Sequence, residues 1–353
     1  MIKRLPLLAI LALIVLITYV VTDTLISAGS FKTIEPHFNG LIEKIDLPVA
    51  GPEDIEVDGT SGLAFISCDD KRSNFTDPGS ISGAILLLDI NDSLRRIRNI
   101  TPPQLTDFHP HGISLFHTKD GRKILFIINH RMQKPRQVVE RMEWRNDSLI
   151  HLETIEDEKL MTSPNDLAAT GERSFYVTND HYYSEPGLGR TVEEYLQRAI
   201  SYVNYYDGKS FKKEADHIAY ANGVQVDPDG QTVYVASVTG RKILVYKRKS
   251  DDSLELSSEV NVETGVDNID LDENGDLLIG CHPQLLKFVA HGKDPKNFSP
   301  SQVIKINKID FSVEEIFLHD GSIYSGSTVA ADYQNKILVG SVFEPAFLIL
   351  HKD

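Results

Sequence analysis

Thr232-Val-Tyr-Val-Ala-Ser237 follows the dipeptide Asp229-Gly230 and precedes a second apolar run, Lys242-Ile-Leu-Val-Tyr246. Runs rich in β-branched and aromatic residues, joined through an Asp-Gly turn, indicate antiparallel β-hairpins. The same pattern recurs about every 55 residues beyond residue 45, which is typical of a repeat architecture. The six strand-forming runs occupy residues 62–67, 123–128, 174–178, 232–237, 276–280 and 336–341.

Six units of strand, turn, strand, loop and strand predict a six-bladed β-propeller, an all-β fold with a central channel. One blade alone cannot bury both faces of its sheet, so the ring must close to be stable. We therefore expect one ring domain, residues 31–353, although a length of 353 residues would by itself suggest two domains. One stretch, residues 191–203, has apolar residues at helical spacing and predicts a helix over one face of the ring.

The first 30 residues, 1–30, differ in composition from the rest of the chain. Lys3 and Arg4 precede an almost wholly apolar run, residues 5–21, and no clear cleavage site follows it. This pattern predicts an uncleaved signal anchor in a membrane, with the ring exported to the extracellular or periplasmic side. A cleaved signal peptide, which would leave a secreted protein, is the alternative. If the source is eukaryotic, five sequons would accept glycans: Asn74, Asn91, Asn99, Asn146 and Asn297.

Charge and cysteine content exclude several classes of protein. The chain has 36 Lys and Arg against 51 Asp and Glu, a formal net charge of −15. An acidic surface repels phosphate backbones, so we expect no nucleic-acid partner. The only cysteines are Cys68 and Cys281, which excludes a disulfide scaffold and a cysteine-rich zinc or iron–sulfur site.

Polar residues occur at one register of the repeat, shortly before each strand-forming run. The six pairs at this register are Glu53-Asp54, His111-Gly112, Asn165-Asp166, Asn222-Gly223, Asp267-Asn268 and Ser327-Thr328. The innermost strand of each blade borders the channel, so equivalent positions direct carboxylate and amide oxygens at one axis. Oxygen ligands without cysteine are the set that Ca²⁺ prefers. An isolated Asn or Asp before a strand is more often a turn cap, but several pairs in register favour a calcium site.

The histidines of the channel are candidates for acid–base chemistry. His111 occupies the ligand register, and His130 ends the neighbouring strand of the same blade. A histidine beside a metal can act as a general base on water. For His130, and for His181 and His282 at similar points of their blades, a hydrogen bond to a channel carboxylate is the alternative interpretation.

Several motifs resemble the serum paraoxonase/arylesterase family. They are Gly51-Pro-Glu-Asp-Ile-Glu56, Pro110-His-Gly-Ile-Ser114, Asn129-His130, Pro164-Asn-Asp166, Tyr176-Val-Thr-Asn-Asp-His-Tyr182, Ala221-Asn-Gly223, Val266-Asp-Asn-Ile269, Gly280-Cys-His-Pro283 and Gly326-Ser-Thr-Val329. They occur in the family's order over nearly the whole chain. A more distant similarity connects the chain to gluconolactonase and strictosidine-synthase-like propellers. The resemblance implies a six-bladed propeller with two calcium ions, one catalytic and one structural, in its channel.

The resemblance also implies roles for particular residues. The ligands of the catalytic calcium would be Glu53, Asn165, Asn222, Asp267 and Asn268. The deeper, structural calcium would be held by the side chains of Asp54 and Asp166 and the backbone carbonyls of Ile55 and Ile113. The catalytic dyad would be His111 and His130, with a calcium-bound carboxylate such as Asp267 as the alternative.

Two departures from the family pattern affect these expectations. Vertebrate members close the ring with a disulfide, but the matching stretches here, residues 41–42 and 348–350, contain no cysteine. Ring closure must therefore depend on strand pairing, and we expect no bridge between Cys68 and Cys281. The predicted helix at 191–203 carries several charged residues, which argues against a lipoprotein partner.

These features together predict a calcium-dependent hydrolase of lactones and aryl esters. Ca²⁺ would polarise the carbonyl of a small-molecule substrate, and His111 would activate the attacking water. No Gly-x-Ser-x-Gly motif occurs, which argues against a covalent serine esterase. We expect the loop at 68–73 and the helix at 191–203 to roof the pocket. The alternatives are an organophosphate or sugar-lactone hydrolase on the same site, and a non-catalytic, membrane-tethered propeller with structural Ca²⁺.

Overall fold

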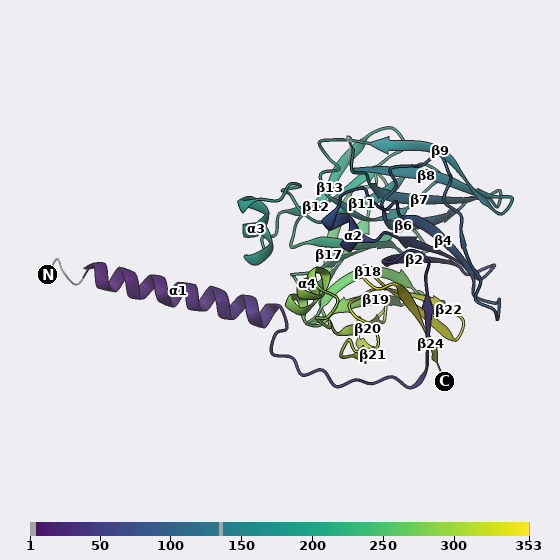
Figure 1. Cartoon of the computed structure of the whole chain (residues 1–353). Coiled ribbons are helices and arrows are strands. Elements are labelled where there is room, and N and C mark those ends of the chain that lie inside the picture. The colour runs from purple at the N-terminus through teal and green to yellow at the C-terminus, as the bar shows by residue number, and fades with distance from the viewer. Residues whose placement is uncertain (1–4, 134–136, 353) are drawn as a thin grey trace.

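The computed structural model of the protein describes residues 5–133 and 137–352. Its strands form six four-stranded antiparallel sheets arranged in a ring (Figure 1). The predicted all-β, six-bladed propeller is therefore confirmed. Each of the six runs identified in the sequence forms the second strand of its blade, and the polar register lies on the innermost strand before it.

Five blades are formed by consecutive strands. Blade 1 contains β2 (Pro52–Asp58), β3 (Leu63–Cys68), β4 (Ala84–Asp89) and β5 (Ile97–Asn99). Blade 2 contains β6 (Pro110–His117), β7 (Lys123–His130), β8 (Gln137–Arg145) and β9 (Ser148–Glu156). Blade 3 contains β10 (Pro164–Ala169), β11 (Phe175–Asn179), β12 (Ser201–Tyr206) and β13 (Phe211–Ile218). Blade 4 contains β14 (Ala221–Val226), β15 (Thr232–Ser237), β16 (Lys242–Arg248) and β17 (Leu254–Asn261). Blade 5 contains β18 (Gly265–Leu271), β19 (Leu277–His282), β20 (Ser301–Ile306) and β21 (Val313–His319).

Blade 6 combines strands from both ends of the chain. Its strands are β22 (Ser327–Tyr333), β23 (Lys336–Ser341), β24 (Ala346–Lys352) and β1 (Gly40–Asp46). β1 pairs antiparallel with β24, so that Leu41 lies opposite His351. Both cysteines are buried and free. The ring therefore closes through backbone pairing without a disulfide, as the sequence predicted.

The hydrophobic core of the described residues lies between the blades. Each of six clusters of buried apolar side chains draws its members from two neighbouring blades. Between blades 6 and 1, for example, Val329 and Phe347 belong to the same cluster as Ile55 and Leu86. Burying one such side chain contributes about 1.5–3 kcal/mol. A separated blade would expose the clusters on both of its faces, so the closed ring is what fixes the innermost strands around the channel.

The described part of the chain also has four helices outside the sheets. They are α1 (Leu5–Ser27), α2 (Lys71–Thr76), α3 (Leu188–Tyr195) and α4 (Leu285–Lys293). α1 projects away from the ring, and α3 and α4 lie on the side of the ring from which it projects (Figure 1). The predicted helix at 191–203 was wrong in its bounds, because the chain leaves the helix after Tyr195 and enters β12 at Ser201. Neither α2 nor α4 was predicted from the sequence, where residues 68–73 were expected to form a loop.

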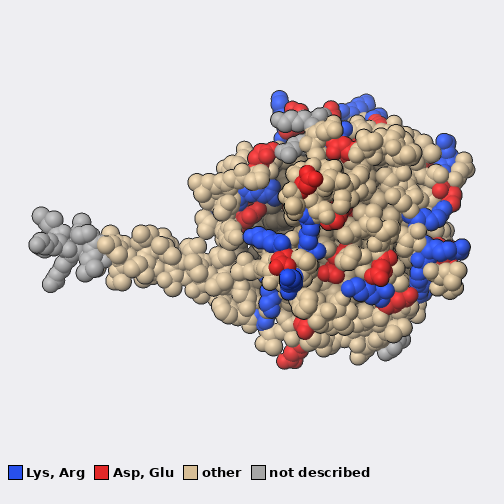
Figure 2. Space-filling view, viewed as in Figure 1, with Lys and Arg blue, Asp and Glu red and all other residues tan. Residues whose placement is uncertain are grey.

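Residues Leu8–Ser27 of α1 are apolar and long enough to cross a membrane, and none of this segment is buried in the protein. Asp23 is the only charged residue of α1, and the part of the helix that projects from the ring shows no charged side chains, unlike the ring (Figure 2). Its C-terminal end is attached to the ring. Thr24 Oγ1 donates to the carbonyl oxygen of Tyr195 at 3.3 Å, and the backbone amide of Leu285 donates to that of Ala28 at 3.0 Å. Such a helix fits either a membrane anchor or a signal sequence.

The five sequons differ in exposure. The side chains of Asn91, Asn99, Asn146 and Asn297 are exposed. Asn74 lies in α2 and is buried, and its side-chain amide donates to the carboxylate of Asp69 at 3.0 Å. A glycan on Asn74 does not fit this fold, which corrects the expectation for that position.

Candidate active site

Each innermost strand is interrupted at the polar register. In blade 1 the strand pairing shifts between Pro52 and Asp54, and in blade 3 it shifts between Pro164 and Leu167. The other four blades show the same irregularity. A bulge of this kind breaks the alternation of side chains and re-aims them. It explains how two successive residues, Glu53 and Asp54, both line cavities of the channel.

Two glycines of the register are required because the next blade approaches closely. A Cβ atom on Gly112 would lie 2.6 Å from the carbonyl oxygen of Asn165, and one on Gly223 would lie 2.4 Å from that of Asp267. Both distances are far shorter than a van der Waals contact. The absent side chains let the backbones that carry the candidate ligands pack together around the channel.

The channel opens into an upper cavity of about 580 Å³. Six of the predicted site residues line it: Glu53, His111, His130, Asn165, Asn222 and Asp267. Asn268 joins them because its side-chain amide donates to Glu53 Oε1 at 2.9 Å. Other lining residues come from the roof, namely Lys71 and Phe75 of α2 and Arg190 of α3. The structure therefore brings together every residue predicted for the catalytic calcium and the dyad.

Four of these residues have a buried oxygen with no hydrogen-bond partner among the described residues. The atoms are Glu53 Oε2, Asn165 Oδ1, Asn222 Oδ1 and Asn268 Oδ1. Two of the amides are held at their nitrogen: Asn165 Nδ2 donates to Asp180 Oδ2 at 3.1 Å, and Asn268 Nδ2 donates to Glu53. A buried oxygen without a donor costs about 1–3 kcal/mol. A cation close to these oxygens would remove that cost.

A second, smaller cavity lies further along the channel. Its volume of about 10 Å³ is roughly that of one water-sized particle. All four predicted ligands of the structural calcium line it: Asp54, Ile55, Ile113 and Asp166. Backbone amides fix both carboxylates, since Asp54 accepts from Ile113 and Asp166 accepts from Val224, each at 2.7 Å.

The buried carboxylates of the channel repel one another. Burial, followed by the charges of Asp54 and Asp267, raises the pKa of Glu53 well above its usual range. Burial raises the pKa of Asp54 to about 7, although two backbone hydrogen bonds oppose this shift. Burial and the charge of Asp54 raise the pKa of Asp166. Carboxylates that converge in this way need a nearby positive charge to stay ionised.

These groups fit a calcium ion. They are oxygen donors only, from carboxylates, amides and backbone carbonyls, and Ca²⁺ coordinates six to eight such oxygens with flexible geometry. Among the residues that the structure describes, no three His, Cys, Asp or Glu side chains are arranged to hold a metal by themselves. The fit therefore depends on the asparagine amide oxygens, which a site for zinc would not use.

His111 and His130 lie side by side, with ring centroids 4.8 Å apart. His130 Nε2 lies 2.7 Å from the carbonyl oxygen of Pro164, and because a carbonyl only accepts, this nitrogen carries the proton. His111 Nδ1 lies 3.1 Å from Lys71 Nζ and 3.2 Å from Glu53 Oε2. Burial and then the charge of Lys71 lower the pKa of His111 well below its usual range, and the same causes lower that of His130 to about 4. Both rings are therefore neutral at pH 7.

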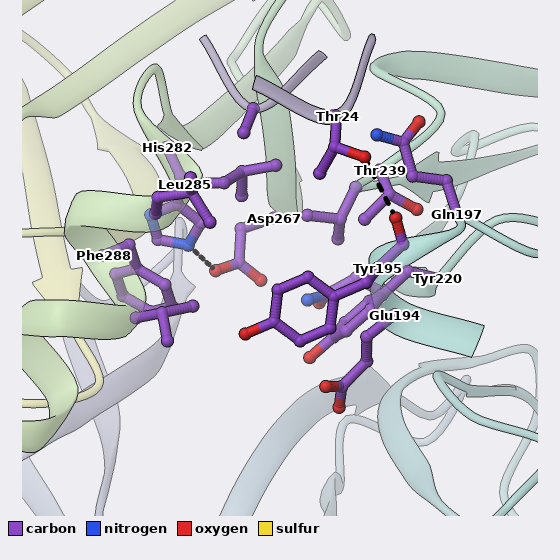
Figure 3. A pocket seen from close by; sticks show the side chains of 15 residues that line it. Thr24, Glu194, Tyr195, Gln197, Tyr220, Thr239, Asp267, His282, Leu285 and Phe288 are labelled. Carbon is purple, nitrogen blue, oxygen red and sulfur yellow. Dashed lines mark hydrogen bonds and ion pairs between the residues drawn. The ribbon is translucent and has the colours of Figure 1, made fainter. Parts of the chain in front are cut away.

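Asp267 borders both the upper cavity and a neighbouring, largely apolar cavity of about 310 Å³ (Figure 3). His282 Nε2 lies 2.7 Å from Asp267 Oδ2. The ring of His282 stacks on Phe288 of α4, with centroids 3.7 Å apart. His282 thus pairs with a channel carboxylate, as the alternative interpretation held. Tyr195 of α3 and Leu285 of α4 also line the apolar cavity (Figure 3).

His181 also pairs with carboxylates. Its Nδ1 lies 2.7 Å from Asp180 Oδ1, and its Nε2 lies 3.1 Å from Glu194 Oε1 on α3. The second contact is an ion pair, because it is outside hydrogen-bond geometry. Burial opposes ionisation of both groups, but their mutual hydrogen bond lowers the pKa of Asp180 to about 2 and raises that of His181 to about 9. Asp180 was not predicted as a site residue, and only its place in the motif at 176–182 marked it.

Comparison with known proteins agrees with this architecture. Residues 30–349 match the family model Arylesterase. Human serum paraoxonase/arylesterase 1 is 36% identical over 306 residues, which cover 84% of each chain. Serum paraoxonase/arylesterase 2 of Bos taurus is 35% identical over 324 residues, which cover 86% of this chain and 89% of the relative.

Two solved structures show the same fold at low sequence identity. A luciferin-regenerating enzyme superimposes with a TM-score of 0.56 at 13% identity, covering 89% of this chain and 98% of the other. Regucalcin of Agrobacterium tumefaciens, described as a calcium-binding protein, superimposes with a TM-score of 0.53 at 14% identity, covering 89% and 93%.

The fold and the relatives define the class: this is a carboxylic ester hydrolase built on a six-bladed propeller. The prediction of an enzyme is therefore confirmed at the level of the class. More narrowly, the chain belongs to the serum paraoxonase/arylesterase family, as its motifs indicated.

Proposed function

We propose that the protein is a calcium-dependent hydrolase of lactones and aryl esters, with two calcium ions in its channel. The upper ion would be held by Glu53, Asn165, Asn222, Asp267 and Asn268. The deeper ion would be held by Asp54, Asp166 and the carbonyls of Ile55 and Ile113. Aryl esters are the substrates that the names of the family and its relatives give. Lactones follow from the resemblance of the motifs.

One observation carries this proposal. Among the described residues, one buried oxygen each of Glu53, Asn165, Asn222 and Asn268 accepts no hydrogen bond, and these residues surround one cavity that is also lined by His111. Buried polar atoms almost always have a partner, so four exceptions in one place support a ligand that accepts lone pairs. The adjoining volume of about 580 Å³ is large enough for a small-molecule ester beside that ligand.

The chain's own residues would supply positioning and proton transfer. A calcium ion bound in the upper site would act as a Lewis acid that polarises the substrate carbonyl and stabilises the oxyanion. His111 would accept a proton from the attacking water, and its low pKa keeps it neutral for this role. In the structure Lys71 Nζ donates to His111 Nδ1, so the Lys71 side chain would have to move aside for water to reach that nitrogen. His130, fixed by its bond to Pro164, would support the ring of His111.

We further propose that residues 1–30 form an uncleaved membrane anchor and that residues 31–353 form the hydrolase domain. The exposed, apolar α1 supports the anchor, and a cleaved signal peptide is the alternative. The contacts of Thr24 and Ala28 with the ring would then place the face carrying α3 and α4 towards the membrane. The small-molecule substrate would enter from that side.

The test is an assay of the purified full-length chain against an aliphatic lactone, a homoserine lactone, phenyl acetate and an organophosphate, with and without chelator. We expect turnover of the lactones and phenyl acetate that is lost with chelator and restored by Ca²⁺. His111→Gln should fold normally and lower kcat about 100-fold or more. His217→Gln, at an exposed position on β13, is the matched control and should change nothing. Turnover that is insensitive to chelator would contradict the proposal, and turnover of the organophosphate alone would favour the alternative substrate class.

A further inference from the structure

We propose that Asp180 is a positioning residue that holds the amide of Asn165 with its oxygen towards the upper cation site, and that Glu194 of α3 stabilises this arrangement through His181. The inference rests on the calcium site of the proposed function. It extends that proposal by connecting the roof helix of the pocket to one of the ligands.

The orientation of Asn165 is the first step. A side-chain amide can present either its oxygen or its nitrogen to the channel, and only the oxygen can bind a cation. Asn165 Nδ2 donates to Asp180 Oδ2 at 3.1 Å, while Asn165 Oδ1 is buried without a donor. An ionised carboxylate only accepts hydrogen bonds, so Asp180 selects the orientation in which the nitrogen faces it and the oxygen faces the cavity.

Asp180 is itself fixed. It follows β11, and its backbone amide donates to the carbonyl oxygen of Ser163 at 2.9 Å. Its Oδ1 accepts from the hydroxyl of Ser163 and from His181 Nδ1, the latter at 2.7 Å. With Oδ1 engaged on both sides, Oδ2 is the atom left to face Asn165. The buried position of Asp180 keeps water from replacing these contacts.

His181 connects Asp180 to Glu194 of α3. His181 Nε2 lies 3.1 Å from Glu194 Oε1, and Arg190 Nε donates to the same oxygen at 3.1 Å. Arg190 also donates to the carbonyl oxygen of Ser184 at 3.1 Å. Glu194 therefore joins the helix to the buried ring of His181. The side chain of Glu194 is 39% exposed, so solvent screens this pair and its effect should be smaller than that of Asp180.

Isothermal titration of the full-length protein with Ca²⁺ would test the inference. The deeper site lacks Asn165, so its binding step is an internal control and only the upper step should change. Asp180→Ala should weaken the upper step about 10- to 100-fold, the range for residues that orient metal ligands. Asp180→Asn keeps one acceptor for Asn165 and should recover part of the loss. Glu158→Gln, an exposed acid between β9 and β10, removes the same charge and should leave both steps unchanged.

The contribution of α3 has its own test. Glu194→Gln should weaken the upper step by about twofold to fivefold. If it acts through Asp180, it should have no further effect in the Asp180→Ala background, because the effects of coupled residues do not add. An undiminished effect of Glu194→Gln in that background would show that the two residues act independently and would overturn the connection.

The outcomes separate this inference from the proposal beneath it. If the wild-type protein binds no Ca²⁺, the proposed calcium site fails. If the wild type binds two ions and Asp180→Ala binds them equally well, only the positioning role fails. Melting temperatures measured in excess chelator show whether each variant folds, independently of calcium binding. If Asp180→Ala does not fold, the calcium titrations of Asp180→Asn and Glu194→Gln test the inference instead. An unchanged upper binding step in both variants would overturn it.

Discussion

Asn268 and Glu53 lie 215 positions apart in the sequence, yet the side-chain amide of Asn268 donates to Glu53 Oε1 at 2.9 Å and to its carbonyl oxygen at 3.2 Å. Thr328 Oγ1 donates to the same carbonyl oxygen at 2.7 Å. A candidate ligand on blade 1 is thus held by side chains from blades 5 and 6. The geometry of the upper site therefore depends on the closed ring.

The first prediction concerns Glu53→Gln. This variant keeps an oxygen that can accept from Asn268 but removes one negative charge from the upper site. We expect calcium affinity at this site to fall about 10- to 100-fold, with kcat/KM falling by about 100-fold or more at subsaturating Ca²⁺. The measurements are calcium titration and esterase kinetics. Glu314→Gln, an exposed acid on β21, is the charge-matched control, and equal losses in both variants would contradict a ligand role for Glu53.

The second prediction concerns ring closure. Deleting residues 1–27 removes α1, which contacts the ring mainly at its C-terminal end, and should leave the melting temperature within a few degrees of the parent chain. Deleting residues 1–46 also removes β1 and leaves the backbone of β24 unpaired along one edge. Each lost hydrogen bond costs about 1 kcal/mol, so this variant should melt at a much lower temperature or aggregate. Thermal unfolding and size-exclusion chromatography distinguish the two, and equal melting temperatures would show that closure does not depend on β1.

The third prediction is an opposite pH dependence of stability with and without calcium. Burial raises the folded-state pKa of Asp54 and of Asp270 to about 7, above the value of 3.8 expected for unfolded Asp. Between these values the folded, calcium-free protein holds protons that the unfolded chain has released, so its stability should fall as pH rises from 5 to 7. Saturating Ca²⁺ competes with those protons and should reverse the trend. Urea unfolding at pH 5 and pH 8, with chelator or with Ca²⁺, measures this, and a chelated protein that is more stable at pH 8 would contradict it.

The sequence predicted the fold and much of the site because both follow from the repeat. Asp-Gly or Asn-Gly turns precede the second strand in four of the six blades, and the polar pairs coincide with the bulges of the innermost strands. The helix bounds could not be predicted as well. Val203 fits the helical spacing by accident, but it lies in β12 and its backbone pairs with β11 and β13. Tertiary pairing overrides local pattern in such short segments.

The orientation of the site residues could not be predicted from the repeat either. Whether the side-chain amide of Asn165 turns its oxygen or its nitrogen to the channel depends on Asp180. The pairing of His181 with Glu194 depends on how α3 folds back over the ring. The buried state of Asn74 likewise follows from the packing of α2. A sequon or a polar pair in the sequence identifies the residue type, whereas the partner is set by segments that are distant in the chain.

The fourth prediction concerns Lys71, whose ammonium lies 3.1 Å from His111 Nδ1. Its charge, second only to burial, lowers the pKa of His111. If His111 is the general base, kcat/KM should fall as pH drops through the pKa of His111, and in the wild type this acid limb should lie below pH 6.5. Lys71→Met keeps the length of the side chain but removes its charge, so protonation of His111 becomes easier and the limb should move to higher pH. Lys119→Met, at an exposed position between β6 and β7, is the control and should leave the profile unchanged. A limb that stays in place in Lys71→Met would show that a group other than His111 accepts the proton.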